Sequence, residues 1–201
     1  MSGAKKPSKG TTAAEVMAQL AGDKKYQRKT QAAEAARQVR VEELRRAEQP
    51  IVEDLRNAGV GVSSVWDLVN TDEPYPQALP ILLDHLQRGG YPDKVMESLG
   101  RALAVKPAAF AWDTLRELYL AAQGRGHEEG LAVALGASAT PDHLDHLIAL
   151  LDESGRGSSR IHFLRPIKRV GGKRGRDVLI ALQGDPLFGK EASALLKGRA
   201  G

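Results

Sequence analysis

Cysteine is absent from the 201-residue sequence, and aromatic residues make up only 4% of it. The absence of cysteine excludes disulfides, iron–sulfur clusters and cysteine-ligated zinc, and it favours a reducing compartment, so we expect a cytoplasmic protein. So few aromatic residues leave little material for a surface that stacks on bases. No stretch approaches the roughly 18 apolar residues of a membrane-spanning helix, and no signal-peptide run follows the first lysines. We therefore expect neither membrane insertion nor secretion by that route.

Sustained alternation of apolar and polar residues, the mark of a β-strand, is also missing, which predicts an all-α fold. Instead, leucines at 82, 115, 147 and 179 recur at intervals of 33, 32 and 32 residues, each within an amphipathic stretch. A turn with glycine or proline follows each stretch, at residues 89–92, 124–126, 155–157 and 184–186. Another apolar helical stripe follows each turn, so the pattern predicts four helical hairpins.

This repeated unit of helix, tight turn and helix, over residues 76–199, resembles the HEAT-repeat family. The resemblance implies a right-handed α-solenoid of stacked hairpins, with a concave surface lined by the second helices. Upstream we expect capping helices over residues 50–75, the first of them opening at Pro50. Before these we expect a helical N-terminal extension over residues 11–49, much of it one long helix, and a disordered basic tail over residues 1–10.

Charge is unevenly distributed, because residues 1–49 carry a net +5, residues 50–153 a net −9 and residues 154–201 a net +8. The last block contains a run of eight basic residues without an acid among them: Arg156, Arg160, Arg165, Lys168, Arg169, Lys173, Arg174 and Arg176. We predict that this basic run is a binding site on the second helix of the third hairpin, which Pro166 should kink, and on a turn over residues 171–176. The alternative is a solvated face, or one that pairs with the acidic middle of the chain.

Other constellations carry weaker signals. Trp66 and Trp112 lie on apolar helical stripes, which favours core packing over base stacking. His143 and His146 are three residues apart and could share a metal, but no third ligand has diagnostic spacing, so we expect surface residues and no metal. The pair Asp84 and His85 is interpreted as accidental.

Catalytic motifs are not found: the sequence has no phosphate loop between strand and helix, no nucleophile elbow and no zincin spacing. We therefore expect a non-enzymatic adaptor or scaffold, without a cofactor, that holds a protein partner with an acidic surface. The alternative is a protein that binds nucleic-acid phosphates without reading sequence. An enzyme similar to the HEAT-like DNA glycosylases is the least favoured, because no glycosylase motif matches. The sequence does not indicate an oligomeric state.

Overall fold

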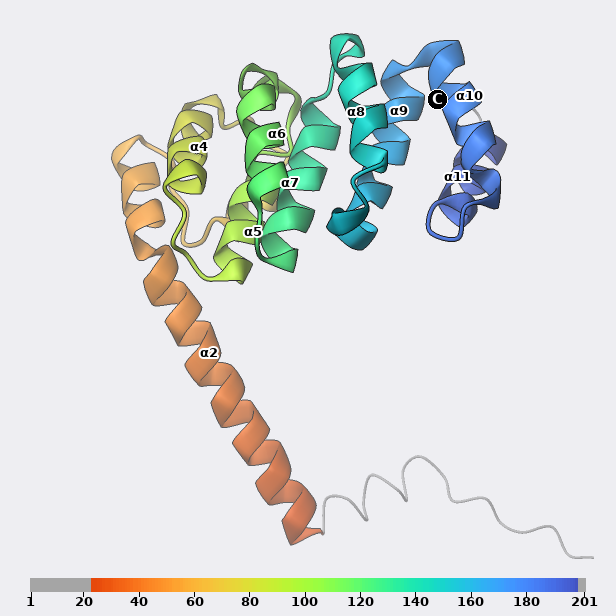
Figure 1. Ribbon diagram of the computed structural model, residues 1–201. Coiled ribbons are helices and arrows are strands. Elements are labelled where there is room, and N and C mark those ends of the chain that lie inside the picture. Colours follow the sequence, from red (N-terminus) through yellow and green to blue (C-terminus); the bar gives the residue numbers. More distant parts are fainter. Residues whose placement is uncertain (1–22, 199–201) are drawn as a thin grey trace, which may run out of the picture. The chain divides into compact units, whose positions relative to one another are not determined.

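The computed structural model describes residues 23–198, and the chain divides into two units between Glu43 and Leu44. Residues 23–198 contain ten α-helices, five short 3-10 helices and no strand (Figure 1). The α-helices are α2 (Lys24–Asn57), α3 (Trp66–Val69), α4 (Leu79–Arg88), α5 (Asp93–Ala102), α6 (Trp112–Ala121), α7 (Arg125–Ser138), α8 (Leu144–Leu151), α9 (Leu164–Val170), α10 (Gly172–Ala181) and α11 (Gly189–Lys197). The 3-10 helices are η1 (Pro76–Ala78), η2 (Lys106–Ala111), η3 (Pro141–His143), η4 (Ser154–Phe163) and η5 (Leu182–Gly184). The all-α prediction is confirmed for the described residues.

Helix α2 runs through Pro50, where the sequence predicted that one helix ends and another begins. A proline inside a helix leaves the carbonyl four residues earlier without its intrahelical donor. Ile51 and Leu55, beyond the proline, are fully buried, and their burial outweighs the loss of that one hydrogen bond. The predicted tail over residues 1–10 lies outside the described residues.

The second unit is built by helices that pack on their neighbours along the chain. Helix α7 packs against α5, α6 and η4, and α10 packs against α9 and α11. Figure 1 shows α6 and α7 lying side by side. The four leucines of the sequence period lie in α4, α6, α8 and α10, and each is fully buried. The period therefore predicted core positions correctly, while a right-handed solenoid stays a prediction.

The third predicted hairpin differs from the expected pattern. Its second helix is split into the 3-10 helix η4 and the short helix α9, and Gly157 within η4 has a positive φ of 53°. Residues 172–176, expected in a turn, instead open helix α10 directly after Gly171. Pro166 lies in the first turn of α9, where its missing N–H breaks no intrahelical bond, so the predicted mid-helix kink is wrong.

Glycine allows α5 and α7 to approach closely. A Cβ atom on Gly100 of α5 would lie 2.6 Å from the backbone carbon of Gly130 on α7. A Cβ atom on Gly130 would lie 2.6 Å from the carbonyl oxygen of Glu97. Real Cβ atoms do not approach backbone this closely, so both positions require glycine for the observed helix spacing. Within residues 23–198, no helix is both long enough and apolar enough to cross a membrane.

Candidate functional site

Two cations of the basic run bind backbone oxygens at the C-terminal ends of α6 and α7. Arg156 donates hydrogen bonds to the carbonyl oxygens of Leu120 and Ala122, the second at 2.7 Å. Arg169 donates to the carbonyl oxygen of Gly136 at 2.8 Å and to two further carbonyls at the end of α7. The last carbonyls of a helix have no intrahelical donor, and the helix dipole favours a cation there. These two side chains therefore cap helices.

Two further cations of the run do the same for α8 and α11. Arg160 donates to the carbonyl oxygen of Leu151 at the end of α8, and its guanidinium lies 5.2 Å from the ring centroid of Phe188. The Lys168 ammonium lies 2.6 Å from the carbonyl oxygen of Leu195 near the end of α11. Half of the basic run is thus engaged with the folded chain itself, in a capping role that the sequence did not predict.

The other half of the run is exposed: Arg165, Lys173, Arg174 and Arg176. Arg174 pairs with Asp145 at 2.5 Å, and the partly buried Arg156 lies 3.8 Å from Glu128, so some pairing with the acidic middle of the chain does occur. Arg165 lies 4.0 Å from Glu191, and its side chain is 80% exposed. Lys173 and Arg176 have no ionic or hydrogen-bond partner among residues 23–198. Within residues 23–198, Lys173 and Arg176 are therefore open to a ligand, and Arg165 is held only by its 4.0 Å contact with Glu191.

Arg165 lies on the rim of a groove of about 500 Å³ between α7, η4, α9 and α11. Its apolar lining consists of Val133, Gly136 and Ala137 of α7, Ile161 of η4 and Pro166 of α9, and its polar lining of His162, Arg165, Arg169 and Glu191. Gly136 shapes this groove, because a Cβ atom there would lie 2.9 Å from the Pro166 side chain. The groove therefore combines an apolar floor with two arginines and one glutamate.

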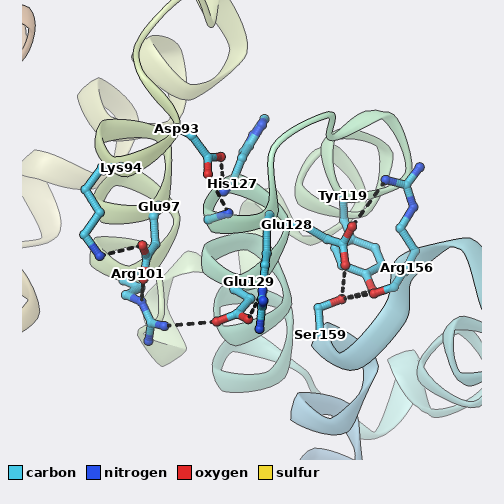
Figure 2. Close-up of polar contacts among 12 residues, drawn as sticks. Asp93, Lys94, Glu97, Arg101, Tyr119, His127, Glu128, Glu129, Arg156 and Ser159 are labelled. Carbon is cyan, nitrogen blue, oxygen red and sulfur yellow. Dashed lines mark hydrogen bonds and ion pairs between the residues drawn. The ribbon is translucent and has the colours of Figure 1, made fainter.

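A buried polar cluster ties α6 and η4 to the first turn of α7 (Figure 2). The Ser159 hydroxyl contacts the Glu128 carboxylate and lies 2.8 Å from the Tyr119 hydroxyl. Because the Ser159 hydroxyl donates its one hydrogen to the Glu128 carboxylate, the Tyr119 hydroxyl donates to Ser159, and burial raises the pKa of Tyr119 to about 12. Ser159 is 2% exposed and its hydrogen-bonding capacity is used by these partners, so the cluster is a structural link and does not present a nucleophile.

A second set of polar contacts joins α5 to α7 (Figure 2). Asp93 accepts hydrogen bonds at 2.9 Å from the backbone N–H groups of Gly126 and His127, which are free donors in the first turn of α7. Within α5, Glu97 accepts from Lys94 and Arg101, each at 2.8 Å, and Arg101 also lies 3.8 Å from the Glu129 carboxylate on α7. These contacts fix the start of α7, the helix that also supplies one wall of the groove.

Burial lowers the pKa of three histidines, His127, His143 and His162, against smaller opposing effects of nearby carboxylates. The unfolded chain therefore binds protons, near the ordinary histidine pKa of about 6.5, that the folded chain does not bind. We expect the free energy of unfolding to be highest above that pKa and to fall as the pH is lowered from about 7.5 to 5.

The substitution His127→Leu tests the source of this pH dependence, because the buried Nε2 atom of His127 has no hydrogen-bond partner among residues 23–198. Urea unfolding at a series of pH values gives the free energy of unfolding at each pH. Between about pH 7.5 and 5 this free energy should fall less steeply for the variant than for the unsubstituted chain. Identical slopes would show that His127 does not contribute.

A buried histidine also links the end of α2 to α4. His85 is 1% exposed, its Nε2 atom lies 3.0 Å from the Asp54 carboxylate, and its Nδ1 atom lies 2.7 Å from the Tyr91 hydroxyl. Asp84, whose place next to His85 in the sequence was interpreted as accidental, pairs with Arg88 and not with His85. No sequence signal marks Asp54, because it lies 31 residues away.

The other constellations have structural roles. Trp112 is 1% exposed, as predicted for a core residue, and its ring stacks on His143 at a centroid distance of 4.1 Å. Trp66 is only partly buried, and the Lys94 ammonium lies 5.0 Å from its ring centroid. No group of three metal-ligating side chains occurs within the described residues, so His143 and His146 do not gain a third ligand there.

No protein-family model, curated protein or solved structure matches this chain.

Proposed function

We propose that the chain is a non-enzymatic adaptor, built as a HEAT-like right-handed α-solenoid, that holds a protein segment with acidic and apolar side chains. The proposed site is the groove between α7, η4, α9 and α11. The observation that carries the proposal is Arg165, whose 80% exposed side chain stands beside an apolar floor and reaches Glu191 only at 4.0 Å. An apolar anchor beside a charged rim is a common arrangement in protein interfaces.

The packing of α7 supports the solenoid part of the proposal. This helix contacts α5 and α6 before it in the chain and η4 after it, as expected when each repeat packs on its neighbours. The periodic leucines are all buried, as a continuous core between stacked hairpins requires.

Phosphate binding by the whole basic run is the competing proposal for this region. Arg156, Arg160, Lys168 and Arg169 already bind carbonyl oxygens, and a phosphate would have to displace these contacts. Because a nucleic-acid site of this kind needs several free cations together, the capping contacts favour a protein segment as the ligand.

The test is selection of peptides from a random displayed library on the immobilised full chain. Selected peptides should combine aspartate or glutamate with an apolar residue, and the substitution Arg165→Glu should weaken their binding about tenfold or more, because it places a like charge opposite the peptide. The matched control is Arg125→Glu on α7, since Arg125 is 82% exposed and also pairs with a glutamate, at 3.3 Å. Equal losses for the two variants, or selected peptides without acidic residues, would contradict the proposal.

A further inference from the structure

Four basic side chains are crowded into the first six residues of helix α2: Lys24, Lys25, Arg28 and Lys29. All four are exposed, as is every residue from 23 to 43. No acidic residue lies three or four positions from any of them in the helix. This cluster is therefore a concentrated positive surface within the first unit of the chain.

The spacing of the cluster places like charges next to one another. Lys24 and Arg28, and likewise Lys25 and Lys29, are four residues apart, and Lys25 and Arg28 are three apart. Side chains at these separations are neighbours on a helix surface, and like charges there destabilise the helix. An anionic ligand relieves this repulsion, so the cluster gains helix stability when it binds one.

Acidic residues close to the cluster are engaged elsewhere. The Asp23 carboxylate caps α2, accepting hydrogen bonds from the backbone N–H groups of Lys25 at 2.8 Å and Tyr26 at 3.3 Å. Glu34 pairs with Arg37 at 2.9 Å. No described hydrogen bond or ion pair therefore occupies the side chains of the four cations.

Helix geometry determines which ligand this surface fits. At 100° per residue, the four cations span an arc of about 140°. The same arc continues along the helix with alanines at positions 32, 35 and 36, whose small side chains allow a close approach to a ligand. A helix of this width fits the roughly 12 Å major groove of B-form DNA, whereas the deep, narrow major groove of RNA does not admit it.

Membranes and protein partners fit this surface less well. The exposed large apolar residues of this segment are Tyr26, Val39 and Val41. At 100° per residue, Tyr26 and Val41 differ in direction by only about 60°, but 15 residues of the helix separate them, and Val39 points along the arc of the cations, so the three form no continuous apolar face. An interfacial membrane helix needs one apolar face, and a protein interface needs a central apolar anchor. The segment offers neither of these.

We propose that residues 24–36 of α2 bind double-stranded DNA without reading its sequence, with the cations on phosphates that flank the major groove. The sequence before the helix adds Lys5, Lys6 and Lys9 to the same end of the chain. This activity is independent of the peptide groove, because the two sites share no residue.

The test measures binding of the full chain to a short fluorescein-labelled DNA duplex by fluorescence anisotropy. Four phosphate contacts predict that affinity falls about 100-fold between roughly 50 and 200 mM salt. The variant with Lys24→Gln, Lys25→Gln, Arg28→Gln and Lys29→Gln should lose at least about tenfold in affinity and most of the salt dependence. Glutamine keeps a good helix propensity, and circular dichroism checks that both chains stay folded.

The matched control removes the same charge from the second unit, through Lys173→Gln, Arg174→Gln, Arg176→Gln and Lys190→Gln, all at exposed positions. This control should change the affinity less than about threefold if the α2 cluster is the site. The DNA duplex should also raise the helical circular-dichroism signal of the unsubstituted chain. Equal losses in the two variants, or binding of phosphatidylserine vesicles or duplex RNA more tightly than DNA, would overturn the proposal.

Discussion

The substitution Gly130→Val should lower the free energy of unfolding by about 3 kcal/mol or more, because it forces α5 and α7 apart. The added Cβ atom would lie 2.6 Å from the Glu97 carbonyl oxygen and 3.1 Å from the Glu97 Cα atom. Both of these are backbone atoms, which cannot rotate away as a flexible side chain does. The helices must therefore separate, and the buried residues Leu99 and Leu131 beside the contact lose packing.

The low helix propensity of glycine opposes the expected loss in the free energy of unfolding. A glycine inside a helix is less favourable than alanine by about 1 kcal/mol, so Gly130→Ala would stabilise α7 if the space were free. A net loss for Gly130→Ala therefore isolates the close contact. Because Gly100→Ala separates the same two helices, the double variant should lose less than the sum of the two single losses.

Urea unfolding followed by circular dichroism measures these differences. The control is Gly184→Ala, since a Cβ atom there meets no other atom within 4 Å and the residue lies outside the α5–α7 contact. Its free energy of unfolding should change by no more than about 0.5 kcal/mol. If Gly130→Ala matched Gly184→Ala, α5 and α7 would not pack as closely as described.

The sequence predicted the helices well where a buried stripe repeats at helical spacing. Leu82, Leu115, Leu147 and Leu179 were placed in helices and in the core, and all are fully buried. The failures occur where local rules compete with tertiary packing. Pro50 predicts a helix start, yet burial of the turn beyond it keeps α2 continuous.

Glycine-rich segments can form a helix where their composition predicts a turn. Residues 171–176 contain three glycines and predict a turn, but Gly171 and Gly175 pack closely on the Ile167 carbonyl oxygen and allow α10 to begin at once. A glycine chosen for flexibility and a glycine chosen for close packing are identical in a sequence. Only the partner atoms distinguish the two.

The basic run shows the same limit for a candidate site. Its residues were identified from composition and spacing, but the partners of Arg156, Arg160, Lys168 and Arg169 are backbone carbonyls. Every residue has such a carbonyl, so no residue type marks the partner in the sequence. Arg169 has two roles, because it caps α7 and also lines the groove. Substituting Arg169 alone would therefore not separate an effect on stability from an effect on binding.

Arg156 gives the cleaner test of the capping role, and Arg156→Met should lower the free energy of unfolding by about 2–3 kcal/mol. The variant keeps an unbranched apolar side chain but removes the hydrogen bonds to the carbonyls of Leu120 and Ala122. It also leaves Glu128, whose side chain is 17% exposed, without the cation 3.8 Å away. A buried carboxylate that loses its counter-charge is more costly than an exposed one.

Arg165→Met is the matched control, because it removes the same charge from the same run at an exposed position. Its free energy of unfolding should change by no more than about 0.5 kcal/mol, with the same dependence on urea concentration. A large loss at Arg156 beside a small one at Arg165 means that the run has two functions, and that only its exposed members are open to a ligand. Equal small losses would mean that Arg156 does not hold the end of α6, and the whole run would again be a candidate for binding.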